Sequence, residues 1–177
     1  GRAVSDGSGP GYAADFMDSY VIPHLGPLLE RGIQVIANAG GLRPAACADA
    51  LRAKAEAAGF APRIGVVEGD DLTARQSEFI TRDTRDMFDA ASILEQIEAA
   101  DRINSLVAYT GAFPIAAALS AGADIVITGR AVDSALALGA LIHEFGWGPD
   151  DFDLLAAGTF AGHLLECSAQ VTGGTFT

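Results

Sequence analysis

Two arginines lie in glycine-rich turns of this 177-residue chain, where they could hold a negatively charged group. Arg43 belongs to the segment Asn-Ala-Gly-Gly-Leu-Arg-Pro, and Arg130 belongs to the segment Thr-Gly-Arg-Ala-Val-Asp-Ser. A guanidinium binds carboxylate or phosphate through two parallel hydrogen bonds, which a lysine cannot copy. Helices that begin after such turns also offer free backbone N–H groups to an anion. The pattern predicts a site for a small anionic substrate.

Carboxylates and further polar or glycine residues occupy the same kind of turn. Asp70 and Asp71 follow a Glu-Gly pair, and Asp133 lies three residues after Arg130, so we interpret all three as candidate acid or base groups. Asp133 has other interpretations, because it could pair with Arg130 or cap the next helix, and the spacing leaves these open. The predicted substrate-binding residues beside the two arginines are Asn38, Gly40, Gly41, Tyr109, Gly111, Thr128, Gly129 and Ser134.

A second polar group lies near the end of the chain. His163 and Cys167 are four residues apart with Glu166 between them, so on a helix His163 neighbours both. A Cys–His pair could act as nucleophile and base, which keeps His163 and Glu166 as candidate catalytic residues. Three ligands this close on one helix rarely enclose a metal, so no metal site is predicted. A structural cysteine beside a hydrogen-bonded histidine is the favoured interpretation.

Short apolar segments that alternate with helical ones must position these turns. Strands are predicted near Ile33–Ala37, Arg63–Glu68, Ser105–Tyr109 and Asp124–Thr128. Apolar strands in this alternation are typical of a parallel sheet covered on both faces. We therefore expect one α/β domain over residues 1–177, with three layers and a mostly parallel, Rossmann-like sheet. Strand-to-helix turns of such a sheet share one edge, where ligands bind.

The helices are predicted from capping residues and periodicity. Pro44 suits a helix start and Gly59 a helix end, whereas Pro23 should break the helix predicted over Tyr12–Arg31. The remaining helices are expected after Ser92, over Pro114–Gly122, over Ala131–Phe145 and after Pro149. The helix Ala131–Phe145 is apolar around nearly its whole circumference, so it should be buried by the domain or by a partner.

Composition excludes several classes of function. Half of the residues are apolar and the formal net charge is −12, which argues against DNA or RNA as a partner. No apolar run reaches the roughly 18 residues of a membrane span. Neither the dinucleotide-binding glycine pattern nor a Walker lysine is present. The two cysteines form no disulfide or zinc pattern, and with no leader sequence the expected location is cytoplasmic.

Several blocks in one order resemble the acyclic terpene utilisation (AtuA) family. They are GIQVIANAGGLRPAACADAL, GDDL, YTGAFPIAAALSAGADIVITGRAVDSALALGALIHEFGW and AAGTFAGHLLECSAQVTGG, and the similarity extends from about Gly11 to the last residue. The resemblance implies a cytoplasmic protein of the catabolism of acyclic terpenoids such as citronellol and geraniol, whose intermediates are coenzyme A thioesters. Family members are longer at both ends, so we expect this chain to be a piece of a longer protein.

The family's matching positions contain most of the residues singled out above. They are Asn38, Gly40, Asp70, Asp71, Tyr109, Gly111, Pro114, Thr128, Gly129, Arg130, Asp133, Ser134, His163, Glu166, Cys167, Gly173 and Gly174. The first functional hypothesis is an enzyme, or its anion-binding part, that acts on a branched acyl-CoA or carboxylate at the carboxyl edge of the sheet. The second is a non-catalytic binding or scaffolding subunit, with the helix Ala131–Phe145 as its contact surface. The sequence identifies no cofactor, and a coenzyme A thioester is a candidate substrate. The expected protein partners are a second copy of the chain or the missing parts of a longer chain.

Overall fold

Three parallel strands form the centre of the structure, a computed structural model that describes residues 9–100, 103 and 105–174. They are β1 (Val35–Ala37), β2 (Ile64–Val67) and β3 (Ile125–Thr128), and β3 lies between the other two. Ile125 of β3 pairs with Val35 on one side and Ile64 on the other. All four residues of β3 are buried, because strands flank it on both sides and helices cover both faces.

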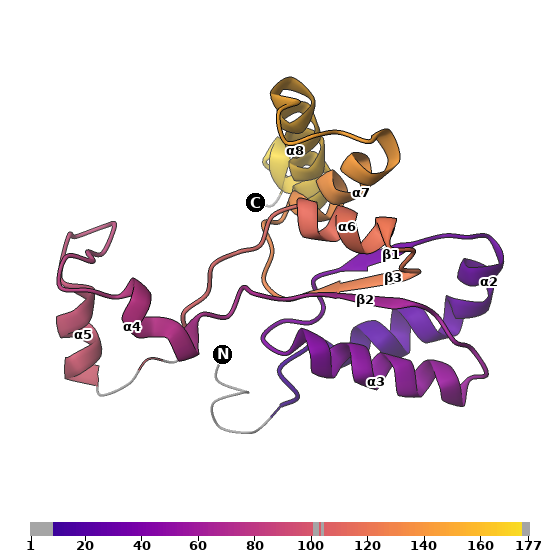
Figure 1. Ribbon diagram of the computed structural model, residues 1–177, viewed down its shortest axis with the longest axis horizontal. Coiled ribbons are helices and arrows are strands. Elements are labelled where there is room, and N and C mark those ends of the chain that lie inside the picture. Colours follow the sequence, from indigo (N-terminus) through magenta and orange to yellow (C-terminus); the bar gives the residue numbers. More distant parts are fainter. Residues whose placement is uncertain (1–8, 101–102, 104, 175–177) are drawn as a thin grey trace.

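The first half of the chain covers one face of the sheet. The segments η1 (Phe16–Val21), η2 (Ile22–His24) and α2 (Leu25–Glu30) form an interrupted helix near α3 (Pro44–Ala57), below the sheet in Figure 1. Pro23 lies in the first turn of η2, so the predicted break occurs there. The core of this layer consists of Met17, Val21, Leu25, Cys47, Leu51 and Ala55, packed against Ile125 and Ile127.

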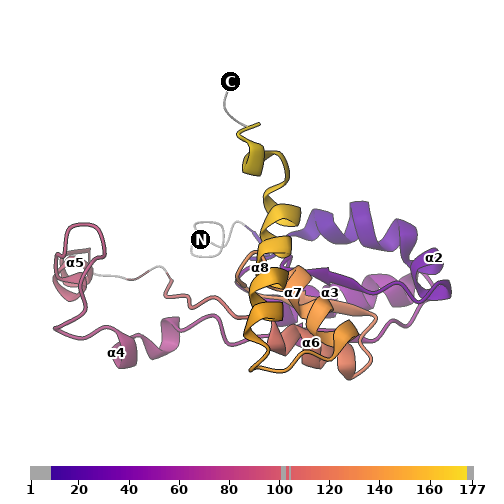
Figure 2. The same cartoon turned by 90° about the horizontal axis from the view of Figure 1, so that it is seen from above.

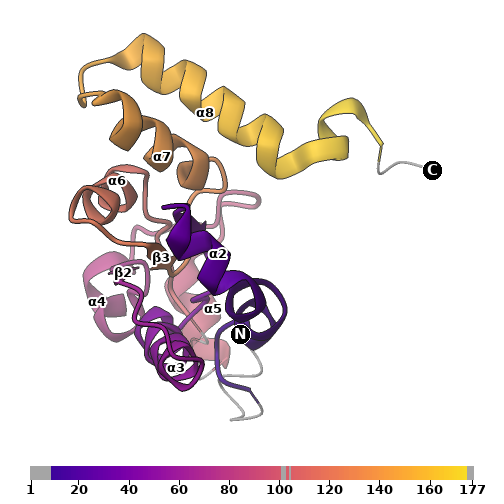
Figure 3. The same ribbon diagram turned by 90° about the vertical axis from the view of Figure 1, so that its right-hand side faces the viewer.

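The second half of the chain covers the other face. Helices α6 (Phe113–Ser120), α7 (Ala135–Phe145) and α8 (Phe152–Cys167) follow one another outward from the sheet (Figures 1 and 3). Val126, which alternates with Ile125 and Ile127 along β3, packs with Val67, Ala112, Ile115, Ala116, Leu119, Ala135 and Ile142. The predicted α/β class, a parallel sheet between helical layers, is therefore confirmed. Within the described residues, no helix has the length and apolar character to cross a lipid bilayer.

The helix predicted over Ala131–Phe145 begins later than expected, and the domain itself buries it. It starts at Ala135 and lies between α6 and α8. A Cβ on Gly139 would be 2.7 Å from Ile115 of α6, and a Cβ on Gly158 of α8 would be 2.7 Å from Leu138 of α7. The domain therefore buries α7 on two sides, which is one of the two alternatives that the sequence left open, while its role as the contact of a scaffolding subunit stays a prediction. The apolar surface lies on α8, where Phe152, Phe160 and Leu165 are mostly exposed.

One of the four predicted strands, Ser105–Tyr109, is not part of the sheet. Val107 forms a single antiparallel bridge with Asp71, and Thr110 forms a parallel bridge with Ala131. The backbone N–H of Ala108 donates to the carbonyl of Asp70 at 2.8 Å. This extended segment therefore pairs with the loops that follow β2 and β3, rather than running beside β2. The three observed strands are parallel, so the shared carboxyl edge remains.

Residues 72–100 form a segment that projects away from the sheet (Figures 1 and 2). It contains η3 (Thr73–Arg75), α4 (Gln76–Phe79) and α5 (Ile93–Ala100). Ser92 accepts a hydrogen bond from the N–H of Glu95 at 3.4 Å, at the predicted helix start. A final helical segment, η4 (Ser168–Thr172), follows α8.

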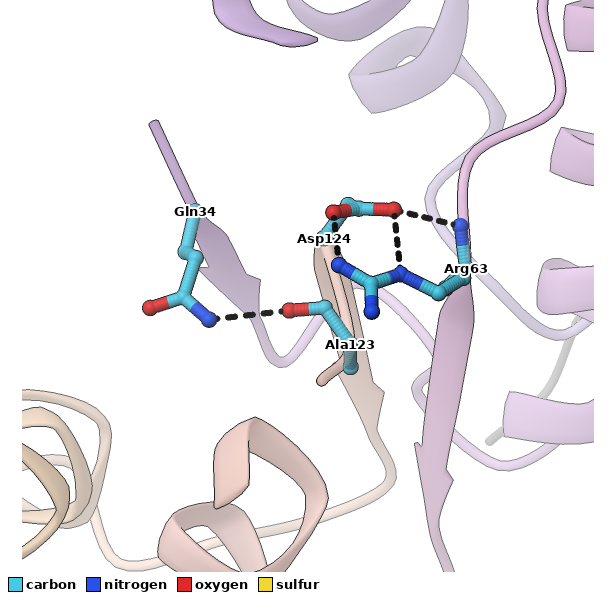
Figure 4. Close-up of polar contacts among 4 residues, drawn as sticks. All are labelled: Gln34, Arg63, Ala123 and Asp124. Atoms are coloured by element: carbon cyan, nitrogen blue, oxygen red, sulfur yellow. Dashed lines mark hydrogen bonds and ion pairs between the residues drawn. The ribbon is translucent and has the colours of Figure 1, made fainter. Parts of the chain in front are cut away.

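Polar contacts tie the amino ends of the strands together (Figure 4). Asp124 accepts hydrogen bonds from the Arg63 guanidinium at 2.9 and 3.2 Å and from the Arg63 backbone N–H at 2.7 Å. On the other side of β3, Gln34 Nε2 donates to the carbonyl of Ala123 at 3.0 Å. Hydrogen bonds from Arg63 lower the pKa of Asp124, with the arginine's charge adding to the effect. These contacts hold β3 between its neighbours at the edge opposite the predicted site.

Candidate anion-binding site

The turns after the three strands meet at the carboxyl edge of the sheet. The N–H of Gly40, after β1, donates to the carbonyl of Thr128 at 3.1 Å, and the N–H of Gly129 donates to the carbonyl of Val67 at 3.1 Å. The N–H of Thr110 donates to the carbonyl of Arg130 at 3.0 Å, which adds the Ser105–Thr110 segment to the same edge. Backbone hydrogen bonds therefore hold all four predicted turns in one place.

Asp70 fixes the backbone of the loop that carries Arg130. Its side chain is almost fully buried, and Oδ2 accepts a hydrogen bond from the Arg130 N–H at 2.7 Å. A Cβ on Gly129 would lie 2.6 Å from Cγ of Asp70, so the carboxylate occupies the space that a side chain at residue 129 would need. The backbone of Gly129 does not adopt a positive φ. Glycine is thus required here by the close approach of Asp70 rather than by a positive φ.

The side chain of Arg130 is positioned by Tyr109. The guanidinium lies over the tyrosine ring, with Cζ 4.8 Å from the ring centroid, and Nη2 donates to the phenolic oxygen. A cation over an aromatic face is stabilised by the ring's negative potential, but it keeps its full charge. Among the residues that the structure describes, no carboxylate lies within ion-pair distance of this guanidinium.

Asp133 is therefore not the partner of Arg130. It is exposed, and it makes no side-chain hydrogen bond within the described part of the chain. The residue before α7 is Ser134, and its side chain does not cap the helix. Among the described residues, Asp133 therefore neither pairs with Arg130 nor caps the next helix. Because α7 begins at Ala135, Arg130 does not lie at the start of a helix.

A cleft of about 690 Å³ lies beside Arg130. Its polar wall includes Asn38, Ser105, Tyr109 and Arg130, and its apolar wall includes Pro10, Tyr12, Leu42 and Val107. Ser105, Val107 and Tyr109 reach it together because alternate residues of an extended chain point to the same side. Ligand sites of small molecules have volumes of roughly 300–1,000 Å³ and combine apolar walls with a few polar groups. This cleft is our candidate site.

The predicted glycines of the first turn have separate positions. Gly41 lines the cleft with φ of +55°, in the left-handed region that favours glycine, and the N–H of Leu42 donates to the carbonyl of Gly11 at 3.0 Å. Gly40 packs against the backbone, since a Cβ there would lie 2.5 Å from the Thr128 carbonyl oxygen. Gly41 is thus at the cleft, whereas Gly40 joins two turns.

A second hollow of about 480 Å³ lies at the start of α3. Arg43 lines it, but so do Asp49, Glu68, Asp70 and Asp71, and these carboxylates outnumber the arginine. Asp71 Oδ1 also accepts the N–H of Thr73 at 2.9 Å, as the cap of a local turn. The electrostatics of this hollow oppose an anion, so the structure separates Arg43, Asp70 and Asp71 from the cleft beside Arg130.

Three other predicted residues do not face the cleft. Thr128 is fully buried, and its hydroxyl donates to the carbonyl of Gly129 at 2.9 Å. Ser134 is buried against α8, where a Cβ on Gly162 would lie 2.5 Å from the Ser134 carbonyl oxygen. A Cβ added to Gly111 would meet nothing within 4 Å, and this residue does not line the cleft. Thr128 and Ser134 therefore have packing roles in this structure.

The polar group at the end of α8 is a thiol held by its neighbours. Cys167 Sγ lies 3.0 Å from Oε2 of Glu166 and 3.4 Å from Nδ1 of His163. The hydrogen bond to Glu166 raises the pKa of Cys167, and the charge of Asp133 adds to this effect. A raised pKa opposes the thiolate that a nucleophilic cysteine needs. The geometry therefore favours the structural interpretation of Cys167, while acid or base roles of His163 and Glu166 remain predictions.

The apolar wall of the cleft could not be predicted from the sequence. Tyr12 and Leu42 reach it because the N–H of Ala13 donates to the carbonyl of Ala39 at 2.8 Å, which holds the segment before η1 against the turn after β1. No pattern among neighbouring residues of the sequence predicts that contact. The places of Ser105 and Val107 in the cleft could have been predicted, because they alternate with Tyr109 in an extended segment.

An open parallel sheet with a cleft at its carboxyl edge makes this an α/β protein, and the cleft lies where ligands usually bind in such folds. The family model described as "Acyclic terpene utilisation family protein AtuA" matches residues 1–177, and the chain belongs to that family. Comparison with curated proteins and with solved structures gave no match. Family membership links the chain to acyclic terpene utilisation.

Proposed function

We propose that the cleft beside Arg130 binds a branched carboxylate of acyclic terpenoid breakdown, either as the free acid or through the carbonyl end of its coenzyme A thioester. The observation that carries this proposal is the Arg130 guanidinium, which lines the cleft and forms no ion pair within the described residues. Terpenoid breakdown is the context that family membership supports.

Arg130 is prepared for an anion before any ligand arrives. Asp70 holds its backbone at 2.7 Å and Tyr109 holds its side chain, so binding orders little further structure. Holding a flexible side chain in place beforehand removes a cost of about 0.5–1.5 kcal/mol from binding. Because the whole chain carries a formal net charge of −12, an anion is repelled from most of the surface and favours a local positive point such as Arg130.

The apolar wall supports the choice of a branched acid. Pro10, Tyr12, Leu42 and Val107 line the cleft together with the polar groups. A branched hydrocarbon chain would pack there at about 25 cal/mol per Å² of apolar surface removed from water. The cleft volume of about 690 Å³ accommodates an acyl chain with its carboxylate, whereas a coenzyme A moiety would extend outside.

The proposal is a binding function in the cytoplasm, the compartment in which free thiols such as Cys47 and Cys167 are stable. Asp70 is buried behind the loop rather than facing the cleft, so its role in this proposal is to position Arg130. Asn38 and Tyr109 provide further hydrogen-bonding groups beside the guanidinium. No reaction step is assigned to these groups.

Calorimetric titration with geranate, geraniol and geranoyl-CoA tests the proposal. Geranate and the thioester should bind, and geraniol, which has the same chain without the charge, should bind at least tenfold more weakly. Arg130→Ala and Arg130→Lys should each lower geranate affinity about 10–100-fold, because a charged hydrogen bond contributes about 1.5–3 kcal/mol and lysine lacks the forked geometry.

Arg43→Ala is the matched control, since Arg43 lies in a turn of the same edge but outside the cleft. It should leave geranate affinity unchanged, and circular dichroism should show that all variants keep their fold. Equal affinity for geranate and geraniol, or a larger loss from Arg43→Ala than from Arg130→Ala, would refute the proposal.

A further inference from the structure

The projecting segment leaves the sheet through residues 70–73 and returns through residues 105–109 (Figure 1). Asp71 and Val107 form an antiparallel bridge, so the outgoing and returning stretches lie side by side. Three side chains of the returning stretch line the cleft: Ser105, Val107 and Tyr109. The contacts that hold the returning stretch against the outgoing one therefore also set the position of a wall of the cleft.

A side chain completes the pairing of these two stretches. The N–H of Leu72 donates to the carbonyl of Leu106 at 2.8 Å. In a regular antiparallel pair, the N–H of Leu106 would donate back to the carbonyl of Leu72. That carbonyl instead accepts the N–H of Arg75 at 2.8 Å, where the chain enters η3. The hydroxyl of Thr73 takes its place, since Oγ1 accepts the N–H of Leu106 at 3.0 Å.

Asp71 fixes the backbone from which this hydroxyl extends. Its Oδ1 accepts the N–H of Thr73 at 2.9 Å. Asp71 is exposed and does not line the cleft, although the sequence made it a candidate acid or base. Its carboxylate therefore acts on the cleft only through Thr73.

We propose that Thr73 is a positioning residue of the cleft and that it acts through Tyr109. This inference rests on the proposed function, because Tyr109 holds the Arg130 guanidinium that binds the carboxylate. Without the hydroxyl, the N–H of Leu106 would lose its partner, and backbone hydrogen bonds alone would hold the returning stretch. Tyr109 would then shift relative to Arg130, and the guanidinium would lose the contact that orients it.

Calorimetric titration with geranate tests this role on matched variants. Thr73→Val replaces the hydroxyl by a methyl group and should lower geranate affinity about 3–10-fold, the range of one neutral hydrogen bond. Thr73→Ser keeps the hydroxyl and should bind geranate like the unmodified chain. Thr84→Val is the control, because Thr84 Oγ1 also accepts a backbone N–H, from Thr81 at 2.9 Å, but does so outside the cleft. This variant should leave geranate affinity unchanged.

A double-mutant cycle shows whether Thr73 acts through Tyr109. Tyr109→Phe removes the phenolic contact to Arg130, so Thr73→Val should cause a smaller loss of affinity in that background than in the unmodified chain. Equal losses in the two backgrounds would refute an action through Tyr109.

Two variants of Asp71 test the same contact at an exposed position, where circular dichroism should show an intact fold. Asp71→Ala should weaken geranate binding, because the N–H of Thr73 loses its acceptor. Asp71→Asn changes the charge equally but keeps an acceptor oxygen, so it should bind like the unmodified chain. A matching loss in Asp71→Asn would indicate that the carboxylate acts by its charge and would contradict the positioning role.

The results also separate this inference from the proposed function. Equal geranate affinity of Thr73→Val and the unmodified chain, or equal losses in Thr73→Val and Thr73→Ser, would overturn the role of Thr73. The proposed function would stand in that case if Arg130→Ala still weakens binding. Failure of the unmodified chain to bind geranate would refute both.

Discussion

Replacing Gly129 with alanine should destabilise the protein through Asp70. The added Cβ would lie 2.6 Å from both Cγ and Oδ2 of Asp70, which has little room to move because it is 2% exposed. Moving the carboxylate would break its hydrogen bond to the Arg130 N–H, at a cost of about 1.5–3 kcal/mol for a charged bond. Overpacking adds about 1–3 kcal/mol. Since the loop can relax partly, we expect a net loss of about 3 kcal/mol.

Urea unfolding of four proteins measures this effect: the unmodified chain, Gly129→Ala, Asp70→Ala and the double variant. Asp70→Ala removes the side chain that the new Cβ would meet, so the double variant should be clearly more stable than the sum of the two single losses predicts. Gly111→Ala is the control, because a Cβ there meets nothing within 4 Å. A loss below about 0.5 kcal/mol for Gly129→Ala, or additive losses in the double variant, would refute this account of the glycine.

Two further predictions concern titrating groups. Hydrogen bonds from Arg63 lower the pKa of Asp124, so the pair contributes fully above about pH 4 and loses its contribution as pH falls through the lowered pKa. Asp124→Asn should therefore lower the free energy of unfolding by less than about 1 kcal/mol at neutral pH, because Arg63 is 70% exposed. The variant should also lose less of this free energy in acid than the unmodified protein does. Equal losses of the two proteins in urea unfolding at acid pH would contradict this. The hydrogen bond to Glu166 raises the pKa of Cys167, so Glu166→Gln should speed alkylation by iodoacetamide severalfold at neutral pH, with the buried Cys47 unreactive in both proteins. Equal rates for Cys167 would show that Glu166 does not control the thiol.

The ends of helices could be predicted because their signals are local. Pro44 begins α3 as expected, and Gly59, which follows the end of that helix, has φ of +83°, a conformation that favours glycine. Pro23 interrupts the first helical segment for an equally local reason, since proline lacks an N–H. Such features depend on the residue itself and its neighbours along the chain.

The partner of an extended segment depends on distant residues and could not be predicted. Ser105–Tyr109 has the composition of a strand, but its backbone hydrogen bonds go to the loop at Asp70 and Leu72, and the next residue, Thr110, bonds to Arg130. Its alternation still places Ser105, Val107 and Tyr109 on one side, toward the cleft. The alternation of residues in the sequence therefore predicted an extended backbone correctly. Whether that segment joins the sheet depends on which strand edges are free to pair with it, and the sequence does not show this.

Hydrophobicity alone also failed to distinguish the buried helix from the exposed one. Both α7 and α8 are rich in apolar residues, and for α7 the sequence left open whether the domain or a partner buries it. The difference lies in where small residues permit close packing: Gly139 admits Ile115 of α6, and Gly158 and Gly162 bring α8 against the other side of α7. That arrangement buries α7 on two sides and leaves α8 with one covered face.

At the candidate site, the sequence indicated which residues lie at the carboxyl edge of the sheet but not the structural role of each one. Asp70 and Arg130 were both placed at the carboxyl edge, with Asp70 as a candidate acid or base. In the structure Asp70 is buried and holds the Arg130 backbone, while Tyr109 holds the guanidinium at the cleft. A residue fixed at two points presents its charge with little freedom left to lose on binding. The glycine before Arg130 makes this possible, because only a residue without a side chain lets the Asp70 carboxylate reach the loop.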